Sequence, residues 1–83
     1  MYKIVPVLKT RHVEPWAEYV FSEKILEKSQ LHAASMAIKK AVECGWFEGD
    51  QPDVDEMLPK DVIELSEKLF KAHNKSMGID EKN

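Results

Sequence analysis

Carboxylates crowd the second half of the chain, and their spacing is similar to that of a calcium-binding loop. Counted from Asp53 as the first position of an EF-hand loop, Asp55 and Glu64 fall at ligand positions. The same loop needs an oxygen ligand where this chain has Met57, and a glycine where it has Leu58. The sequence therefore predicts a solvated acidic loop, and we expect neither a metal nor another cofactor.

Nucleophilic catalysis is the second chemistry that the residue types suggest, because the chain contains Cys44 and the histidines His12, His32 and His73. If His32 and Cys44 share one helix, they lie about 18 Å apart along its axis, which excludes a catalytic pair. Contact between Cys44 and His73 across two helices is left open. A small buried thiol and a boundary imidazole account for the same residues. We therefore expect a protein that is not an enzyme.

Aromatic and apolar residues on either side of the acidic segment predict a surface that binds a protein partner. Trp46 and Phe47 are adjacent, so in extended backbone their rings point to opposite sides. Large apolar side chains within a polar rim are typical of binding surfaces. The alternative is a second small core that buries these rings. The candidate contact residues are Trp16, Tyr19, Trp46, Phe47, Met57 and Leu58.

The apolar periodicity predicts an all-α fold, a small bundle of two to four helices in one domain of 83 residues. Proline fits the first turn of a helix, so Pro15 and Pro59 are expected to begin helices. A break at Ser29 and Gln30 is favoured over one long helix. The predicted order is an extended arm or edge strand over 1–13, a helix or helix pair over 15–44, an acidic aromatic connector over 45–58, a C-terminal helix over 59–77 and a tail over 78–83.

Each predicted helix has an apolar stripe, and glycines mark two of the helix ends. Gly45 stands where a left-handed residue ends a helix, with Trp46 placed to fold back on the last turn. Gly78 is expected to end the C-terminal helix. The stripes are Ala17, Val20, Phe21, Lys24 and Ile25 in the first segment, Leu31, Ala34, Ser35, Ile38, Ala41 and Val42 in the second, and Val62, Leu65, Ser66, Leu69, Phe70, His73 and Met77 in the third.

Charge and composition disfavour several classes of partner. Fifteen acidic and twelve basic residues give a net charge of −3, which disfavours attraction to nucleic acid or anionic lipid. There is one cysteine, no apolar run near the ~20 residues of a membrane span, and no signal-peptide pattern. We expect a protein of the reducing cytosol.

A DNA-binding helix-turn-helix is the second hypothesis for the last two helices. Lys68, Lys71 and Lys75 line one side of the last helix, but they stand where the helix dipole favours cations. The connector of about fourteen residues also exceeds the ~3 to 4 residue turn of that motif. An inhibitor of a host enzyme, or an acidic mimic of nucleic acid, is a third hypothesis.

Two segments resemble the small tail assembly chaperones of tailed bacteriophages: residues 41–46, which end in Gly45 and Trp46, and residues 52–65. The features that carry the resemblance are an aromatic after a helix, an acidic segment with a proline, a helix start of the form Leu-Pro-x-x-Val and a Gly-Ile-Asp tail. Residues 10–19 are similar in character. The arm over 4–8 matches no part of the pattern.

This resemblance implies a helical protein without enzymatic activity that binds the tape measure protein, and in some systems tail tube subunits, in the cytoplasm of the host cell. Trp46, Phe47, Met57 and Leu58 are then the first positions to test for partner contact. The sequence itself leaves a homo-oligomer open. The alternative is a small helical regulator or inhibitor of a phage or mobile element that binds DNA or a host enzyme.

Overall fold

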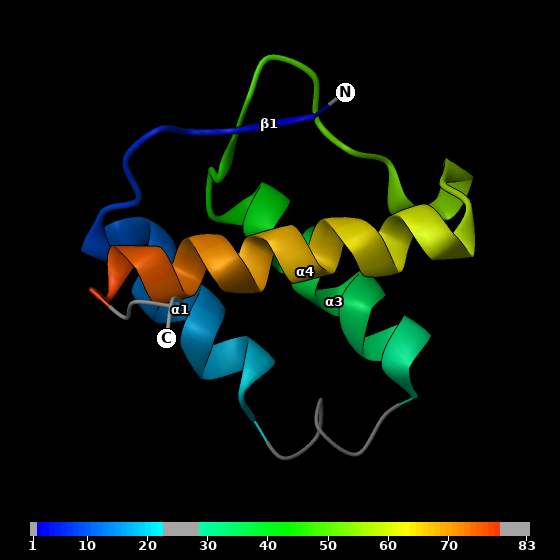
Figure 1. Cartoon of the computed structure of the whole chain (residues 1–83), viewed down its shortest axis with the longest axis horizontal. Helices are drawn as coiled ribbons and strands as arrows, with labels where there is room; N and C mark the ends of the chain where they lie inside the picture. The colour runs from blue at the N-terminus through cyan, green and yellow to red at the C-terminus, as the bar shows by residue number, and fades with distance from the viewer. Residues whose placement is uncertain (1, 23–28, 79–83) are drawn as a thin grey trace.

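The computed structural model describes residues 2–22 and 29–78, and within them it contains three α-helices and one small sheet (Figure 1). The mostly helical fold confirms the predicted class. The elements are β1 (Lys3–Ile4), α1 (Thr10–Val20), α3 (Gln30–Glu43), β2 (Phe47–Glu48), the 3-10 helix η1 (Val54–Glu56) and α4 (Pro59–Ser76).

Helix α1 begins at Thr10, so the predicted start at Pro15 is wrong. The extra turn is held at its amino end by the Nδ1 atom of His12, which accepts a hydrogen bond of 2.9 Å from the N–H of Lys9. Pro15 lies inside the helix and leaves the Arg11 carbonyl without its usual donor. Both residues are exposed, so water can reach that carbonyl.

The buried face of α1 also differs from the predicted stripe. Val13, Trp16 and Val20 are buried at the spacing of one helical face, whereas Phe21 is 48% exposed. Ala17 is half-buried. The predicted stripe lies on the wrong side of the helix because a helix that begins at Pro15 leaves out Val13. With Val13 included, Trp16 lies between Val13 and Val20 on the buried face.

The predicted range 15–44 contains two described helices. Helix α1 ends at Val20, and the backbone N–H of His32 donates to the Ser29 hydroxyl at 3.2 Å, which caps the start of α3. This cap explains why the second helix begins at the Ser29–Gln30 step. The predicted continuation of the first helix through residues 23–28, with the stripe positions Lys24 and Ile25, lies outside the described residues.

The carboxyl end of α3 forms the predicted glycine cap. Gly45 has a φ of 82°, and its N–H donates to the Val42 carbonyl at 3.2 Å. The N–H of Trp46 donates to the Ala41 carbonyl at 3.0 Å. These two bonds define a Schellman motif, which turns Trp46 back toward the helix as expected.

The N-terminal arm pairs with the connector. Strand β1 lies antiparallel to β2, with Ile4 opposite Phe47, and the N–H of Val5 donates to the Trp46 carbonyl at 2.8 Å. The strand ends before Pro6, which has no N–H to donate. The connector is therefore more than a linker, because it supplies a strand, the 3-10 helix η1 and several buried side chains, namely Trp46, Phe47, Pro52 and Val54.

Helix α4 begins at Pro59 and lies across α1 and α3 in Figure 1, with its main interface against α3. Its buried residues are Val62, Leu65, Ser66, Leu69 and His73, all from the predicted stripe. Met77 belonged to that prediction but is 61% exposed, because α4 has ended at Ser76. Gly78 follows with a φ of 80°. No described helix has the length and apolar character needed to cross a membrane.

Candidate partner-binding groove

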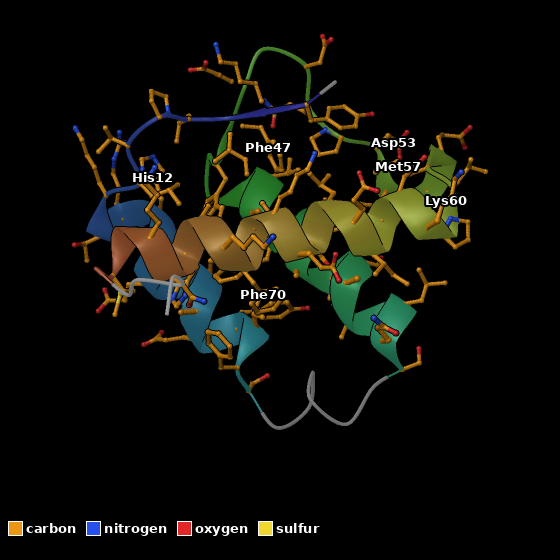
Figure 2. All side chains as sticks on the ribbon, in the orientation of Figure 1. His12, Phe47, Asp53, Met57, Lys60 and Phe70 are labelled. Carbon is orange, nitrogen blue, oxygen red and sulfur yellow. The ribbon has the colours of Figure 1, made fainter. Side chains whose placement is uncertain are left out.

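Three of the predicted contact residues lie in the core. Trp16 and Trp46 are both 0% exposed and Phe47 is 5% exposed, so none of them offers a surface to a partner in the folded protein. All three are buried, as the alternative expected, but they belong to the main hydrophobic core and not to a second small one. Figure 2 shows Phe47 beneath the N-terminal arm, on the side that faces α4.

Both indole rings are buried because the fold satisfies their N–H groups. The Nε1 atom of Trp16 donates to the Ala37 carbonyl at 2.9 Å, and that of Trp46 donates to the His12 carbonyl at 2.7 Å. The two ring centroids are 4.5 Å apart. The bonds connect α1 to α3 and to the segment that follows it, and they remove the cost of burying an unpaired donor.

Tyr19 is half-buried and lies against α3. Its hydroxyl contacts the Met36 sulfur at 3.8 Å, and the Lys40 ammonium lies 5.4 Å from the ring centroid. Tyr19 therefore packs between α1 and α3. It does not line the groove formed by Met57 and Leu58. Of the predicted contact residues, only Met57 and Leu58 share a surface site.

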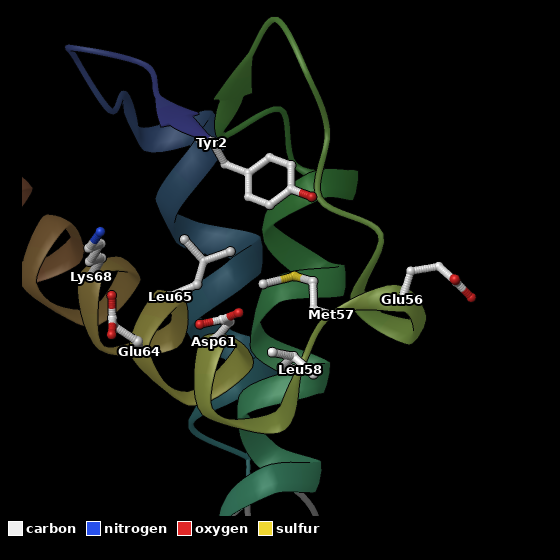
Figure 3. A pocket seen from close by; sticks show the side chains of 8 residues that line it. All are labelled: Tyr2, Glu56, Met57, Leu58, Asp61, Glu64, Leu65 and Lys68. Atoms are coloured by element: carbon white, nitrogen blue, oxygen red, sulfur yellow. The ribbon is translucent and has the colours of Figure 1, made fainter.

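That site is an open groove of about 430 Å³ between the N-terminal arm, η1 and the first turns of α4 (Figure 3). Its lining consists of Tyr2, Glu56, Met57, Leu58, Asp61, Glu64, Leu65 and Lys68. The lining therefore combines apolar side chains with carboxylates and one ammonium group.

The apolar part of the groove is built from three segments. Figure 3 shows Tyr2, Met57 and Leu65 directed toward one space. Leu65 is 8% exposed and belongs to the core as well as to the groove floor. The Tyr2 ring packs edge-on against Phe47, with centroids 6.5 Å apart, so a buried ring holds this wall in place.

Leu58 is the most exposed apolar residue of the groove, at 59%. It is the N-cap of α4, and Pro59 follows at the first helical position. The fixed φ of proline and the first helical hydrogen bonds set the direction of this turn. The Leu58 carbonyl accepts from the N–H of Asp61 at 2.9 Å and from that of Val62 at 3.0 Å. An exposed leucine therefore stands on an ordered backbone.

The charged rim of the groove is predominantly acidic. Glu56, Asp61 and Glu64 are exposed, and none of them has a described cation within 4.0 Å. Asp61 lies in the first turn of α4, where the helix dipole favours a negative charge. Lys68 is the single cation of the lining. The rim therefore has carboxylates that form no ion pair with the described cations, close to exposed apolar surface.

Of the eight lining residues only Met57 and Leu58 were predicted contacts, and among the other six, Tyr2 and Leu65 supply apolar surface. Leu65 lies on the buried stripe of the last helix, as predicted, and it also lines the groove. Tyr2 carries no signal of its own. Its position follows from the pairing of Ile4 with Phe47, which brings the arm across the connector.

The described residues contain no hydrogen-bonded pair of a cysteine and a histidine, which nucleophilic catalysis by Cys44 would require. His73 lies in the aromatic core, with its ring centroid 5.4 Å from that of Trp16. Within the described ranges, Cys44 makes no hydrogen bond to a histidine, and burial raises the pKa of its thiol. In the same residues, no group of three or more histidine, cysteine or acidic side chains is arranged to hold a metal.

The helix-turn-helix hypothesis does not match the chain path. Helices α3 and α4 are separated by residues 44–58, which contain β2 and η1. A DNA-binding pair of helices is joined by a turn of ~3 to 4 residues. These two helices are therefore not arranged as that motif.

Fold and groove together define a small helical protein with a short antiparallel sheet and an open surface groove that has an acidic rim. Comparison of the chain with protein-family models, with curated proteins and with solved structures gives no significant match.

Proposed function

We propose that this protein is a non-enzymatic assembly chaperone that holds an apolar segment of another protein in the groove formed by Tyr2, Met57, Leu58 and Leu65. The observation that carries the proposal is the exposure of Leu58 on an ordered helix start, beside partly buried Met57 and Tyr2. Because the backbone that carries Leu58 is already ordered, binding does not have to order this segment, so more of the contact energy contributes to affinity.

A groove of this kind suits a chaperone that must release its partner. It is open to solvent, and its lining mixes apolar with charged side chains. Burial of Leu58 and Met57 would contribute a few kcal/mol at roughly 25 cal/mol per Å² of apolar surface removed from water. Such a gain protects an apolar segment from aggregation while allowing exchange with its final partner.

The specific role that we propose is tail assembly in a tailed bacteriophage, with the tape measure protein as partner and the tail tube protein as a second partner. Its support is the resemblance of residues 41–46 and 52–65 to tail assembly chaperones. Most of the groove comes from the second of these segments, including Met57, Leu58 and Leu65. The segment that carries the resemblance therefore also forms the candidate contact surface. The working compartment is then the host cytoplasm.

The proposal is tested by the affinity of the purified protein for the tape measure protein encoded in the same genome. Leu58→Ala should weaken the complex by more than about 1 kcal/mol, the behaviour of a central contact residue. Leu31→Ala is the matched control, because Leu31 is also an exposed leucine, at 41%, but lies on α3 outside the groove.

Isothermal titration calorimetry gives both affinities directly. Unchanged affinity in Leu58→Ala, or equal losses in the two variants, would remove the groove from the binding site. Absence of any complex with the tape measure protein and the tail tube protein would refute the assembly role itself.

A further inference from the structure

We infer that the segment bound in the groove is cationic: it carries a large apolar side chain for the floor and lysine or arginine residues beside it. This inference deepens the proposed function and rests on it. The juxtaposition that supports it is the line of Asp61 and Glu64 along one edge of the exposed apolar surface.

The carboxylates of this edge are available to a ligand. The ion pairs of the described residues lie elsewhere, between Lys3 and Glu48 at 3.3 Å, Lys39 and Asp55 at 3.5 Å, and Lys40 and Glu43 at 3.3 Å. A cationic partner therefore need not displace an ion pair between described residues to reach Glu64. An anionic or uncharged segment would instead bring its apolar residues next to unneutralised carboxylates, which is unfavourable at the reduced polarity of a closed interface.

The charges along α4 also give the bound segment a direction. Asp61, Glu64 and Lys68 follow one another at the spacing of three and four residues that keeps side chains on one face of a helix. Lys71 and Lys75 continue the positive charge toward the carboxyl end. The basic residues of the segment therefore lie over the amino-terminal half of α4, and a neutral or acidic residue lies near Lys68.

A second copy of this chain fits the groove less well. The net charge of −3 makes two copies repel one another at long range, and the repulsion grows at low ionic strength. A cationic segment experiences the opposite effect and associates faster as salt is lowered. Salt dependence therefore separates the two occupants.

The test uses two fluorescently labelled helical peptides that share the same apolar residues and differ only in their flanking charges, lysine in one and glutamate in the other. Fluorescence anisotropy with the full chain should show tighter binding of the lysine peptide, and the difference should shrink as salt is added. Glu64→Lys should weaken the lysine peptide by roughly 3- to 10-fold, since it removes one partly exposed attraction and adds a repulsion.

Glu67→Lys provides the matched control. It makes the same change of charge on the same helix, but Glu67 is an exposed residue that does not line this groove. It should change the affinity for the lysine peptide by less than about 2-fold. The combined variant Glu56→Lys and Glu64→Lys should prefer the glutamate peptide.

The outcomes separate this inference from the proposed function. Equal binding of the two peptides, with loss of both in Leu58→Ala, would overturn the cationic preference and leave the groove as a binding site. Equal effects of Glu64→Lys and Glu67→Lys would also overturn it. Failure of both peptides and of the tape measure protein would refute the proposed function. Self-association in sedimentation velocity that Glu64→Lys abolishes would identify a second copy as the occupant and overturn the inference.

Discussion

Replacing Trp46 by phenylalanine tests whether this residue belongs to the core or to a contact surface, the two hypotheses that its sequence position allows. The structure places the indole at 0% exposure, with its Nε1 atom 2.7 Å from the His12 carbonyl. Trp46→Phe removes the donor and part of the ring, and keeps an aromatic side chain at the same place. The expected result is a loss of stability without a direct loss of binding surface.

The size of the loss follows from these two contacts. Loss of a buried hydrogen bond costs about 1 kcal/mol, and the space left by the smaller ring adds a comparable amount, so the total is roughly 1–3 kcal/mol. A chain of this length has a total stability of about 4–12 kcal/mol. With a urea dependence near 1 kcal/mol per M, the unfolding midpoint should fall by about 1–3 M.

Urea unfolding followed by far-UV circular dichroism measures this shift, and Leu58→Ala is the control. Because Leu58 is 59% exposed, its truncation should change the unfolding free energy by less than about 0.5 kcal/mol. An unchanged midpoint in Trp46→Phe, together with weaker partner binding, would instead show that Trp46 is a surface contact. Trp16→Phe, alone and combined with Trp46→Phe, should reveal a coupling of about 0.5–1.5 kcal/mol between the two rings.

Two titratable groups give the remaining predictions. Burial, and then the charges of Arg11 and Lys9, lower the pKa of His12 below its usual value of 6.5, so the unfolded chain takes up this proton more readily than the folded protein. The contribution of His12 to stability is then complete above about pH 6.5 and decreases as the pH falls below it, until the lower folded pKa is reached. Urea midpoints measured across this range should show the decrease, and His12→Gln should flatten it; an unchanged profile in that variant would contradict the assignment. Burial raises the pKa of the Cys44 thiol, so iodoacetamide should alkylate the native protein more slowly than the urea-unfolded chain at the same pH, and equal rates would show that the thiol is exposed.

The helix ends were predictable where a single residue determines the backbone. Gly45 has the positive φ that a Schellman motif needs, and Pro59 begins α4. Both signals are local, so no knowledge of the rest of the fold is required. Pro15 gave the same signal as Pro59 but lies inside α1, because an exposed position with access to water tolerates the missing hydrogen bond.

The candidate site was less predictable because exposure is a property of the whole fold. Trp46 and Leu58 both flank the acidic connector, and both are large and apolar. Trp46 is buried with its indole N–H bonded to the His12 carbonyl, whereas Leu58 is exposed at the position where α4 begins. Neither relation can be read from spacing. The contribution of Tyr2 to the groove depends on strand pairing across more than half of the chain.

The aromatic residues at the start of the connector are buried in the core, and its last residues form part of the groove. The groove depends on the buried end. Trp46 and Phe47 anchor the entry in the core, and Phe47 in turn supports Tyr2, one wall of the groove at the exit. A partner that contacts Tyr2 and Leu58 together would join the N-terminal arm to α4. A ligand that binds only the folded state stabilises it by about 2.7 kcal/mol at a concentration of 100 times its Kd, which is a large part of the stability of so small a domain. Binding in the groove should therefore strengthen the same contacts that form it.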